Sequence, residues 1–189
     1  MHPLSRKAYR IEPLNTDHDR TAFACGEAAL DRYLQQSAGQ DMRRSVAVVY
    51  VLVETAAPHT IAGFYTLSAS SVPLEAFPDG VVRRLPRYPR IPVALIGRMA
   101  TDVRYRGQQC GAHLLVDALA RSCAISEQDM GVAAVVVDAK TDHVAAFYER
   151  FGFIRFTDTK PPRLFIPIKT AREAVGDALP GQIFQRTDP

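Results

Sequence analysis

The sequence predicts an α+β fold built on a mixed β-sheet of six to seven strands flanked by helices. Short apolar stretches without proline, such as Val93–Val103 and Ala133–Asp138, have the length and composition of buried strands. They alternate with segments such as Cys110–Gln128, in which apolar residues recur at helical spacing. A glycine-bearing turn, Arg104–Gly111, joins the first of these strands to that helix. Since the chain has 189 residues and no internal repeat, we expect one domain over residues 1–189.

The N-terminal half is predicted to supply three strands and two helical stretches. We expect strands at Tyr9–Leu14, Ser45–Glu54 and Ile61–Val72, and helices at Asp17–Phe23 and Glu27–Gln40. The last two of these strands are expected to form a hairpin. Its loop is placed around Pro58, because proline is excluded from the middle of a sheet.

The C-terminal half follows Pro73–Pro92, a proline-rich segment predicted to be irregular. Beyond it we expect strands at Val93–Val103, Ala133–Asp138, Phe153–Phe156 and Leu164–Ile168, and helices at Cys110–Gln128, His143–Arg150 and Thr170–Leu179. Thr141 or Asp142 caps the second helix and Gly152 ends it. The core is expected over about residues 9 to 175, with a loose tail from 180 to 189.

Composition indicates a soluble protein of the cytoplasm. No apolar run approaches a membrane span, and the N-terminus lacks the pattern of a secretion signal. The three cysteines have no metal-ligand spacing and are odd in number, which favours reduced thiols. The five histidines are scattered as well, so we expect no metal. A net charge of +3 does not by itself imply nucleic-acid binding.

The turn Arg104–Gly111 is the first candidate site. Backbone N–H groups and the positive end of the helix dipole make the start of a helix a site for anions. A glycine-bearing turn alone, however, is equally typical of an ordinary connection between a strand and a helix.

A second segment, Val132–Phe153 (VAAVVVDAKTDHVAAFYERFGF), adds a strand, a short helix and a further strand in a fixed order. Together with the turn it resembles the GNAT superfamily of acetyl-CoA-dependent N-acetyltransferases. Their pyrophosphate turn follows the pattern Q/R-x-x-G-x-G/A, and here Arg106 and Gly111 match while Gln109 replaces the central glycine. The resemblance implies a single GNAT (acyl-CoA N-acyltransferase) domain whose sheet splays between the fourth and fifth strands.

Further segments are similar to those of GNAT toxins of type II toxin–antitoxin systems: CGEAALDRYL, RRLPRYP, IGRMATDVRYRGQ and RLFIPIKTA. This similarity covers about residues 9 to 175. It implies a toxin that acetylates the α-amine of aminoacyl-tRNA and so blocks translation. The partner that it implies is a ribbon-helix-helix antitoxin; a homodimer is also compatible, and no membrane is involved.

The resemblance also implies which residues bind acetyl-CoA. The turn residues Arg106, Gly107, Gln108, Gln109, Gly111 and Ala112 would bind the pyrophosphate, chiefly through backbone N–H groups. The main chain of Met99, Ala100, Thr101 and Val103 would pair with the pantetheine, although composition fits an ordinary sheet interior equally well.

Tyr148 is the predicted catalytic residue. A phenol with a pKa of about 10 is protonated at neutral pH and can give its proton to a leaving thiolate. In many family members the tyrosine of this FY pair has that role, and Phe147 is expected to pack, against the cofactor or within the fold. The alternative is that both rings are plain aromatic core.

The acceptor is expected to be an α-amine. Val93–Thr101 contains no carboxylate that could act as a general base, and Asp102 is expected to cap the turn. A lysine amine with a pKa of about 10.4 is almost fully protonated at neutral pH and needs such a base, whereas an α-amine with a pKa of about 7.7–8.0 does not.

Clustered arginines are the candidates for tRNA contacts: Arg43 and Arg44 at a helix end, and Arg83, Arg84, Arg87 and Arg90 in the proline-rich segment. Arginine contacts phosphates without reading sequence. A solvated loop or an antitoxin-docking face would have the same composition. Two other functions stay open, namely a GNAT enzyme for a small amine or a protein N-terminus, and a non-catalytic module that binds acetyl-CoA or a partner.

Overall fold

The structure is a computed structural model that describes residues 8–156, 159–176, 180–181 and 184–185. The chain divides into two compact units. The first unit contains residues 1–67, 98–118 and 178–189, and the second contains residues 68–97 and 119–177. Strands β3 (Ala57–Pro73) and β4 (Arg90–Thr101) and helix α4 (Cys110–Gln128) supply residues to both units. The single domain expected from chain length stays a prediction.

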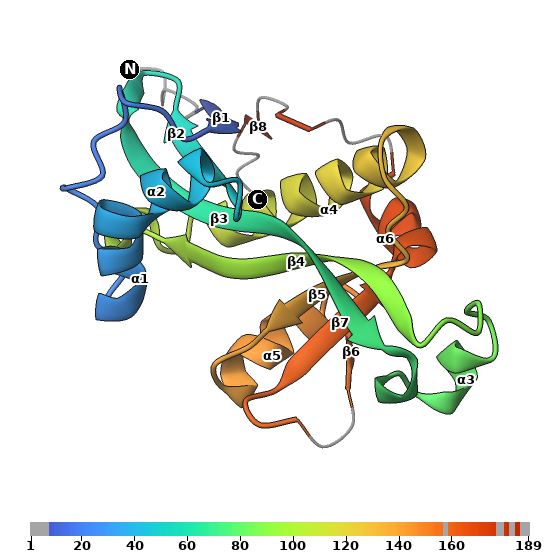
Figure 1. The fold of residues 1–189 in the computed structure, drawn as a ribbon. Coiled ribbons are helices and arrows are strands. Elements are labelled where there is room, and N and C mark those ends of the chain that lie inside the picture. The colour runs from blue at the N-terminus through green and yellow to red at the C-terminus, as the bar shows by residue number, and fades with distance from the viewer. Residues whose placement is uncertain (1–7, 157–158, 177–179, 182–183, 186–189) are drawn as a thin grey trace. The chain divides into compact units, whose positions relative to one another are not determined.

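The first unit is built on an antiparallel sheet in the order β8-β1-β2-β3, followed by the end of β4. Strand β1 (Ala8–Pro13) pairs with β2 (Val48–Glu54), and β2 pairs with β3 in the hairpin that was expected. Pro58 lies inside the bounds of β3, near a register irregularity at the hairpin end where a proline is tolerated. Figure 1 shows β1 in blue, β2 and β3 in turquoise to green, and β8 in red.

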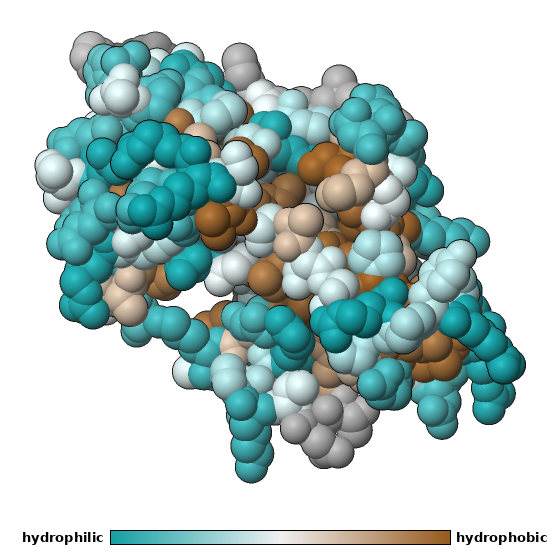
Figure 2. Space-filling model, in the orientation of Figure 1, coloured by the Kyte–Doolittle hydropathy of each residue, from teal (hydrophilic) through white to brown (hydrophobic). Residues whose placement is uncertain are grey.

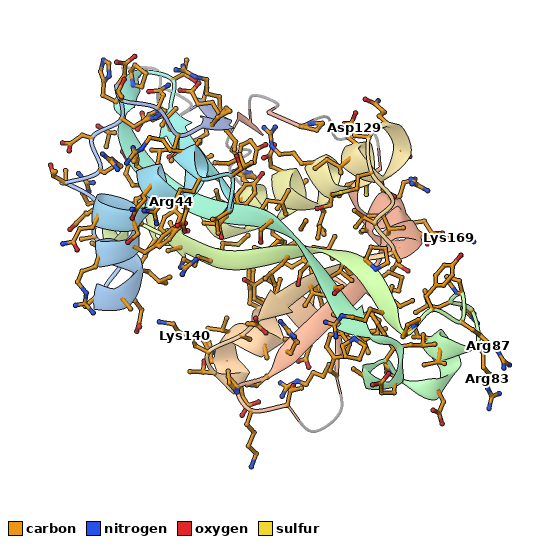
Figure 3. All side chains as sticks on the ribbon, viewed as in Figure 1. Arg44, Arg83, Arg87, Asp129, Lys140 and Lys169 are labelled. Atoms are coloured by element: carbon orange, nitrogen blue, oxygen red, sulfur yellow. The ribbon has the colours of Figure 1, made fainter. Side chains whose placement is uncertain are left out.

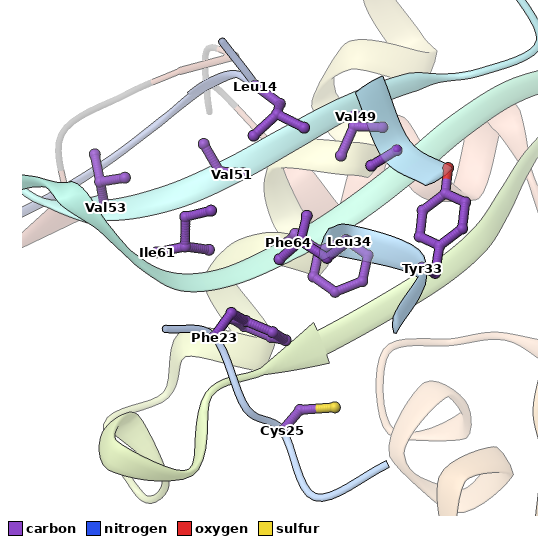
Figure 4. Close-up of a cluster of buried hydrophobic side chains, with 11 residues drawn as sticks. Leu14, Phe23, Cys25, Tyr33, Leu34, Val49, Val51, Val53, Ile61 and Phe64 are labelled. Atoms are coloured by element: carbon purple, nitrogen blue, oxygen red, sulfur yellow. The ribbon is translucent and has the colours of Figure 1, made fainter. Parts of the chain in front are cut away.

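The helices of the first unit pack on this sheet. They are α1 (Ala28–Arg32), a π-helical segment (Tyr33–Ser37) and α2 (Ala38–Arg43), in place of the single helix predicted over Glu27–Gln40. Their buried side chains join those of the sheet in one hydrophobic cluster, shown in Figure 4: Leu14, Phe23, Cys25, Tyr33, Leu34, Ala38, Val49, Val51, Val53, Ile61 and Phe64.

The helix predicted over Asp17–Phe23 is wrong, because the segment is a series of turns. The Asp19 carboxylate accepts hydrogen bonds from the N–H groups of Thr21 (2.9 Å) and Ala22 (3.3 Å) and from the Thr21 hydroxyl (2.6 Å). Aspartate side chains that bond the following backbone compete with helix formation. This competition produces a loop where the sequence pattern indicated a helix.

The second unit contains the start of β4, then β5 (Ala134–Asp138), β7 (Arg163–Pro167) and β6 (Ile154–Arg155) in that order. β4 and β5 are parallel, whereas β5–β7 and β6–β7 are antiparallel. Its helices include α3 (Asp79–Val82), α5 (Asp142–Glu149) and α6 (Ile168–Val175), and a 3₁₀ turn covers Leu74–Ala76. The core of this unit is Val72, Phe77, Ile91, Val93, Ala134, Val136, Phe156 and Phe165.

All seven predicted strands are present, and β8 (Phe184–Gln185) is an additional one. It lies in the tail that was expected to be loose. The tail is attached because β8 pairs with Ala8 and Tyr9 and because the Gly181 N–H donates to the Asp117 carboxylate (2.6 Å). Part of the tail lies outside the described residues, namely 182–183 and 186–189. The same is true of residues 177–179 in the predicted last helix.

Hydrophilic residues dominate the face over α1 and α2 in Figure 2. Across the part of the chain that the structure describes, every helix is too short or too polar to traverse a lipid bilayer.

Candidate functional site

The turn before α4 has an unusual backbone. Gly107 has φ 73° and Gln109 has φ 58°, so both adopt the left-handed region, and Gln109 does so without being glycine. For an ordinary L-residue this region costs about 1–2 kcal/mol relative to the right-handed one. Alternation between the two regions points successive N–H groups toward a common centre, which is the geometry of an anion-binding nest. The family's central glycine and this Gln109 therefore meet the same backbone requirement.

Helix α4 begins at Cys110, as predicted, and its first hydrogen bond runs from the His113 N–H to the Gln109 carbonyl (3.1 Å). The amides of Gly111 and Ala112 belong to the first helical turn, where no preceding helical carbonyl is available to them. The Gln108 N–H instead donates to the Tyr105 carbonyl (3.3 Å) inside the turn. Of the backbone donors predicted for a phosphate, those at the helix start are thus better placed than that of Gln108.

The side chain of Gln108 is attached to the first strand. Its Oε1 accepts a 2.7 Å hydrogen bond from the Tyr9 hydroxyl, and its Nε2 donates to the Arg104 carbonyl (3.3 Å). The Tyr9 ring also packs edge-on against Tyr105, with centroids 6.3 Å apart. No local sequence pattern signals this support, since Tyr9 lies 99 residues from Gln108.

Asp102 anchors the other end of the turn. Its fully buried carboxylate accepts hydrogen bonds from the Arg104 N–H (2.9 Å), from the Arg104 guanidinium (2.8 Å) and from the Ala24 N–H (3.0 Å). Burial acts to raise the pKa of Asp102, but these hydrogen bonds outweigh it and the pKa is lowered. The carboxylate therefore stays ionised and structural, which fits the capping role predicted for it.

Arg106, a predicted cofactor ligand, is already engaged. Its Nη2 donates to the Cys25 carbonyl at 2.9 Å. The neighbouring Val103 N–H donates to the Ala24 carbonyl (2.9 Å), so it is not open to a pantetheine group as the sequence analysis expected. The segment before α1 thus occupies two groups that were assigned to acetyl-CoA. No local sequence pattern signals this contact.

Strand β4 extends beyond its parallel partner. The ladder joins Val93–Ile96 to Ala134–Val137, and β4 continues to Thr101. Met99, Ala100 and Thr101 are half-buried, and Ala100 packs against the core of the first unit. The splay expected between the fourth and fifth strands corresponds to this extension.

Tyr148 lies on α5, which Thr141 caps through a hydrogen bond from the Val144 N–H to its Oγ1 (3.3 Å). The ring packs against Phe147 and Phe153, with centroids 5.2 and 5.5 Å away. Burial raises the pKa of Tyr148 to about 12. Tyr148 is thus both part of an aromatic cluster and a phenol that stays protonated at physiological pH.

Phe147 is half-buried next to it. Its ring lies 5.2 Å from that of Phe151, and the Arg150 guanidinium is 5.7 Å from its centroid. Both contacts come from α5 and the residues that follow it, so Phe147 packs within the fold, and its contact with the cofactor stays a prediction.

The predicted tRNA-contacting arginines fall into two groups. In the first unit Arg43 and Arg44 are exposed at the end of α2, where Figure 3 labels Arg44. Arg44 donates to the side-chain oxygen of Gln40 (2.8 and 3.3 Å) when that amide is oriented toward it. Arg43 and Arg44 thus differ, since Arg44 has a local acceptor.

In the second unit Arg83, Arg84 and Arg87 are exposed around α3, and Arg83 and Arg87 are labelled in Figure 3. Arg90 instead donates to the Ser71 hydroxyl and carbonyl, both at 2.8 Å. Its guanidinium fastens the end of β3 and is less available to a ligand than the other three.

The cysteines show no sign of catalytic activation. All three are buried, and burial raises the pKa of the Cys25 thiol to about 11. Among the described residues, no three histidine, cysteine or acidic side chains come together in a way that would hold a metal ion.

Comparison with known proteins identifies the family. A model described as an acetyltransferase (GNAT) domain matches residues 46–155. The chain belongs to the GNAT family of acetyltransferases. This GNAT protein is 34% identical over 174 residues to the "Probable toxin TacT" of Sinorhizobium fredii, covering 88% of this chain and 94% of that protein. It is 35% identical over 159 residues to the "tRNA-acetylating toxin" of Mycobacterium tuberculosis, covering 84% and 92%.

Solved structures agree with the GNAT fold that was predicted. A tyrosine-to-phenylalanine mutant of KacT superposes with a TM-score of 0.81 at 28% identity, covering 87% of this chain and 98% of KacT. AtaT complexed with acetyl-methionyl-tRNAfMet gives 0.80 at 28% identity, with 87% and 98% covered. A tyrosine-to-phenylalanine mutant of AtaT bound to acetyl-CoA and to the C-terminus of the antitoxin AtaR gives 0.74 at 26% identity, with 89% and 99% covered.

Proposed function

We propose that this GNAT protein is a cytoplasmic toxin that transfers the acetyl group of acetyl-CoA to the α-amine of aminoacyl-tRNA. The observation that carries the proposal is the backbone of the turn, in which Gly107 and Gln109 are both left-handed immediately before α4. A turn of this conformation at a helix start favours the binding of a diphosphate. Structures of the related AtaT contain acetyl-CoA in one case and acetyl-methionyl-tRNAfMet in another, which supports the proposal.

The cofactor would be bound mainly by main-chain groups. The amides of Gln109, Gly111 and Ala112 face the pyrophosphate in this proposal, and the part of β4 beyond its ladder, Met99–Thr101, pairs with the pantetheine. Gln108 and Arg106 support the turn through their side-chain bonds to Tyr9 and Cys25, and Gly107 supplies its conformation.

The acceptor follows from the lack of a base. β4 has no carboxylate from Arg90 to Thr101, and the Asp102 carboxylate is ionised and bound to Arg104 and Ala24. An α-amine with a pKa of about 7.7–8.0 is roughly a quarter to two-thirds neutral between pH 7.5 and 8, so it attacks the thioester carbonyl without such help. The α-amine of an aminoacyl ester meets this condition better than a lysine side chain.

Tyr148 would supply the proton for the leaving group. As the amine attacks, a bond forms between its nitrogen and the carbonyl carbon, and the bond between that carbon and sulfur breaks. The Tyr148 hydroxyl protonates the CoA thiolate, the new amide nitrogen releases its extra proton to solvent, and the Tyr148 phenolate regains a proton from solvent. Burial, which raises the pKa of Tyr148 to about 12, keeps the donor form populated.

Partners follow from the relatives. Because AtaT is bound by the C-terminus of its antitoxin AtaR, we propose that an antitoxin, of the ribbon-helix-helix type that the sequence suggests, inhibits this chain as well. The exposed arginines around α3, Arg83, Arg84 and Arg87, would attract either the tRNA backbone or an acidic antitoxin tail.

The test is acetyl transfer from acetyl-CoA labelled in the acetyl group to bulk aminoacyl-tRNA. We expect label on the amino acid, released when the ester bond to tRNA is hydrolysed, and none on uncharged tRNA. Tyr148→Phe should reduce kcat by roughly 10²–10⁴-fold while acetyl-CoA binding is unchanged. Full activity in that variant would exclude Tyr148 as the acid, and labelling only of free amines or peptide N-termini would exclude tRNA as the acceptor.

A variant with Arg83, Arg84 and Arg87 all replaced by alanine tests whether these arginines attract the tRNA backbone. If these arginines contact tRNA, its KM should rise and the salt dependence of KM should flatten. If they serve only the antitoxin, tRNA kinetics should be unchanged while inhibition by the antitoxin weakens.

A further inference from the structure

Two guanidinium groups converge on one point of the surface of the first unit. Gly39 lies in α2, and the position where a Cβ of Gly39 would sit is 3.2 Å from Nη1 of Arg20 and 3.4 Å from Nη1 of Arg43. Arg43 reaches this point from one turn further along the same helix, whereas Arg20 comes from the loop between β1 and α1. The upper left of Figure 2 shows a hydrophilic surface over this helix.

No acid compensates these two charges. Among the described residues, neither the Arg20 nor the Arg43 side chain forms a hydrogen bond or an ion pair. The acids closest in sequence have other partners, because Asp19 accepts from Thr21 and Ala22, and Asp41 accepts from the Tyr33 hydroxyl (2.9 Å). Like charges at such short range repel each other, so an anion between them would be bound favourably.

Gly39 leaves room beside the two guanidinium groups. A helix interior disfavours glycine by about 0.5–1 kcal/mol relative to alanine. A methyl group at this position would lie in tight contact with Arg20 (3.2 Å) and beside Arg43 (3.4 Å), and would take up part of the space next to both guanidinium groups. The sequence thus has a less stable residue where it leaves room for an anion.

We propose that Arg20 and Arg43 together bind one backbone phosphate of the acceptor tRNA over Gly39. The inference rests on the proposed function and names a subsite of it. Arginine is suited to this task because its planar fork bonds phosphate oxygens in pairs. The turn at Gly107–Ala112 is a separate place on the first unit, which leaves the phosphates of acetyl-CoA to that turn.

The first experiment measures tRNA KM as a function of salt for Arg20→Gln, Arg43→Gln and the double variant. Each single change should raise the KM several-fold and reduce the slope of log KM against log salt by about one. Because both side chains share one phosphate, the double variant should reduce the slope by about one as well. A slope that falls by two would show two independent contacts and overturn the shared site.

The second experiment uses Gly39→Ala. Alanine should raise the free energy of unfolding by about 0.5–1 kcal/mol, because it favours the helix. It should nevertheless raise the tRNA KM in the same direction as Arg20→Gln. A more stable protein with weaker tRNA binding cannot be explained by damaged folding, and an unchanged KM in Gly39→Ala and Arg20→Gln would refute the proposal.

Two controls separate the outcomes. Arg172→Gln removes the same charge from an arginine that is paired with Glu127 (2.7 Å) and should leave the tRNA KM unchanged. A short acceptor without phosphates, an aminoacyl methyl ester, should be acetylated equally by all variants. If the KM for acetyl-CoA rises in Arg20→Gln and Arg43→Gln instead of the KM for tRNA, the bound anion is the cofactor and the tRNA subsite is refuted. If the wild type does not acetylate aminoacyl-tRNA at all, the proposed function itself fails.

Discussion

The Tyr9 hydroxyl donates a 2.7 Å hydrogen bond to Oε1 of Gln108, so the first strand holds the side chain of a residue in the turn before α4. Tyr9 is 1% exposed, and its ring contacts Tyr105 in the same turn. A turn that binds through backbone amides depends on such support, because its own side chains do not fix the direction of the N–H groups.

Tyr9→Phe should therefore weaken acetyl-CoA binding without affecting the chemical step. A neutral hydrogen bond of this kind contributes about 0.5–1.5 kcal/mol, so we expect the KM for acetyl-CoA to rise about 2- to 10-fold. Steady-state kinetics with varied acetyl-CoA measure this, and kcat should change little. Tyr88→Phe removes a hydroxyl from an exposed tyrosine (64%) and serves as the control. Equal effects of both variants would contradict the supporting role of Tyr9.

Gln109→Gly should stabilise the protein. The left-handed backbone at Gln109 (φ 58°) favours glycine, and the gain is reduced by the greater freedom of glycine in the unfolded chain. We expect the free energy of unfolding to rise by about 0.5–1 kcal/mol, measured by chemical denaturation. Gln108→Gly is the matched control: it removes the bond to Tyr9 and should destabilise. If Gln109→Gly destabilises as well, the backbone at Gln109 is not strained.

Asp102→Asn should lower stability in a pH-dependent manner. At pH 7 the loss should be on the order of 1–3 kcal/mol, because a buried carboxylate that bonds Arg104 and Ala24 is replaced by a neutral amide. The pKa of Asp102 is lowered in the folded state, so its contribution is complete above the unfolded pKa of about 3.9 and is lost as the pH falls through the folded value.

The measurement is denaturant unfolding of both proteins between pH 7 and pH 2.5. The difference between wild type and Asp102→Asn should be constant down to about pH 4 and shrink below it. A difference that stays constant at low pH would show that the charge of Asp102 does not stabilise the fold.

The pH profile of kcat/KM should rise to about pH 8 as the α-amine loses its proton and then stay level. Burial raises the pKa of Tyr148 to about 12, so no descending limb from this group is expected below about pH 10. Initial rates from pH 6 to 10 provide the check. A continued rise toward pH 10 would instead indicate a lysine acceptor, and a fall near pH 9 that is missing in Tyr148→Phe would contradict the high pKa.

The elements that depend on local patterns could be predicted from the sequence. Helix α4 starts at Cys110 because apolar spacing and a glycine-bearing turn agree there, and α5 starts after the Thr141 cap for similar reasons. The family resemblance, confirmed by the comparisons, supplied the remaining architecture, including the extension of β4 beyond its ladder.

Contacts between distant segments could not be predicted. The helix expected at Asp17–Phe23 failed because Asp19 bonds to the backbone that follows it, and the role expected for Arg106 did not foresee its bond to the Cys25 carbonyl, 81 residues away. The position of the Arg20 and Arg43 guanidinium groups beside Gly39 could not be predicted either, because no sequence pattern places a loop residue over a helix.

The two residues of β8 protect part of strand β1 from pairing with a strand of another copy of the chain. Unpaired backbone at the margin of a sheet is a template for intermolecular strand addition, and β8 covers Ala8 and Tyr9 of β1. The rest of β1 is discouraged from such growth by the ion-paired Arg10 and Glu12 (2.7 Å) and by Pro13. Truncation after Val175 would uncover Ala8 and Tyr9 and should make the protein more prone to form aggregates rich in β-structure.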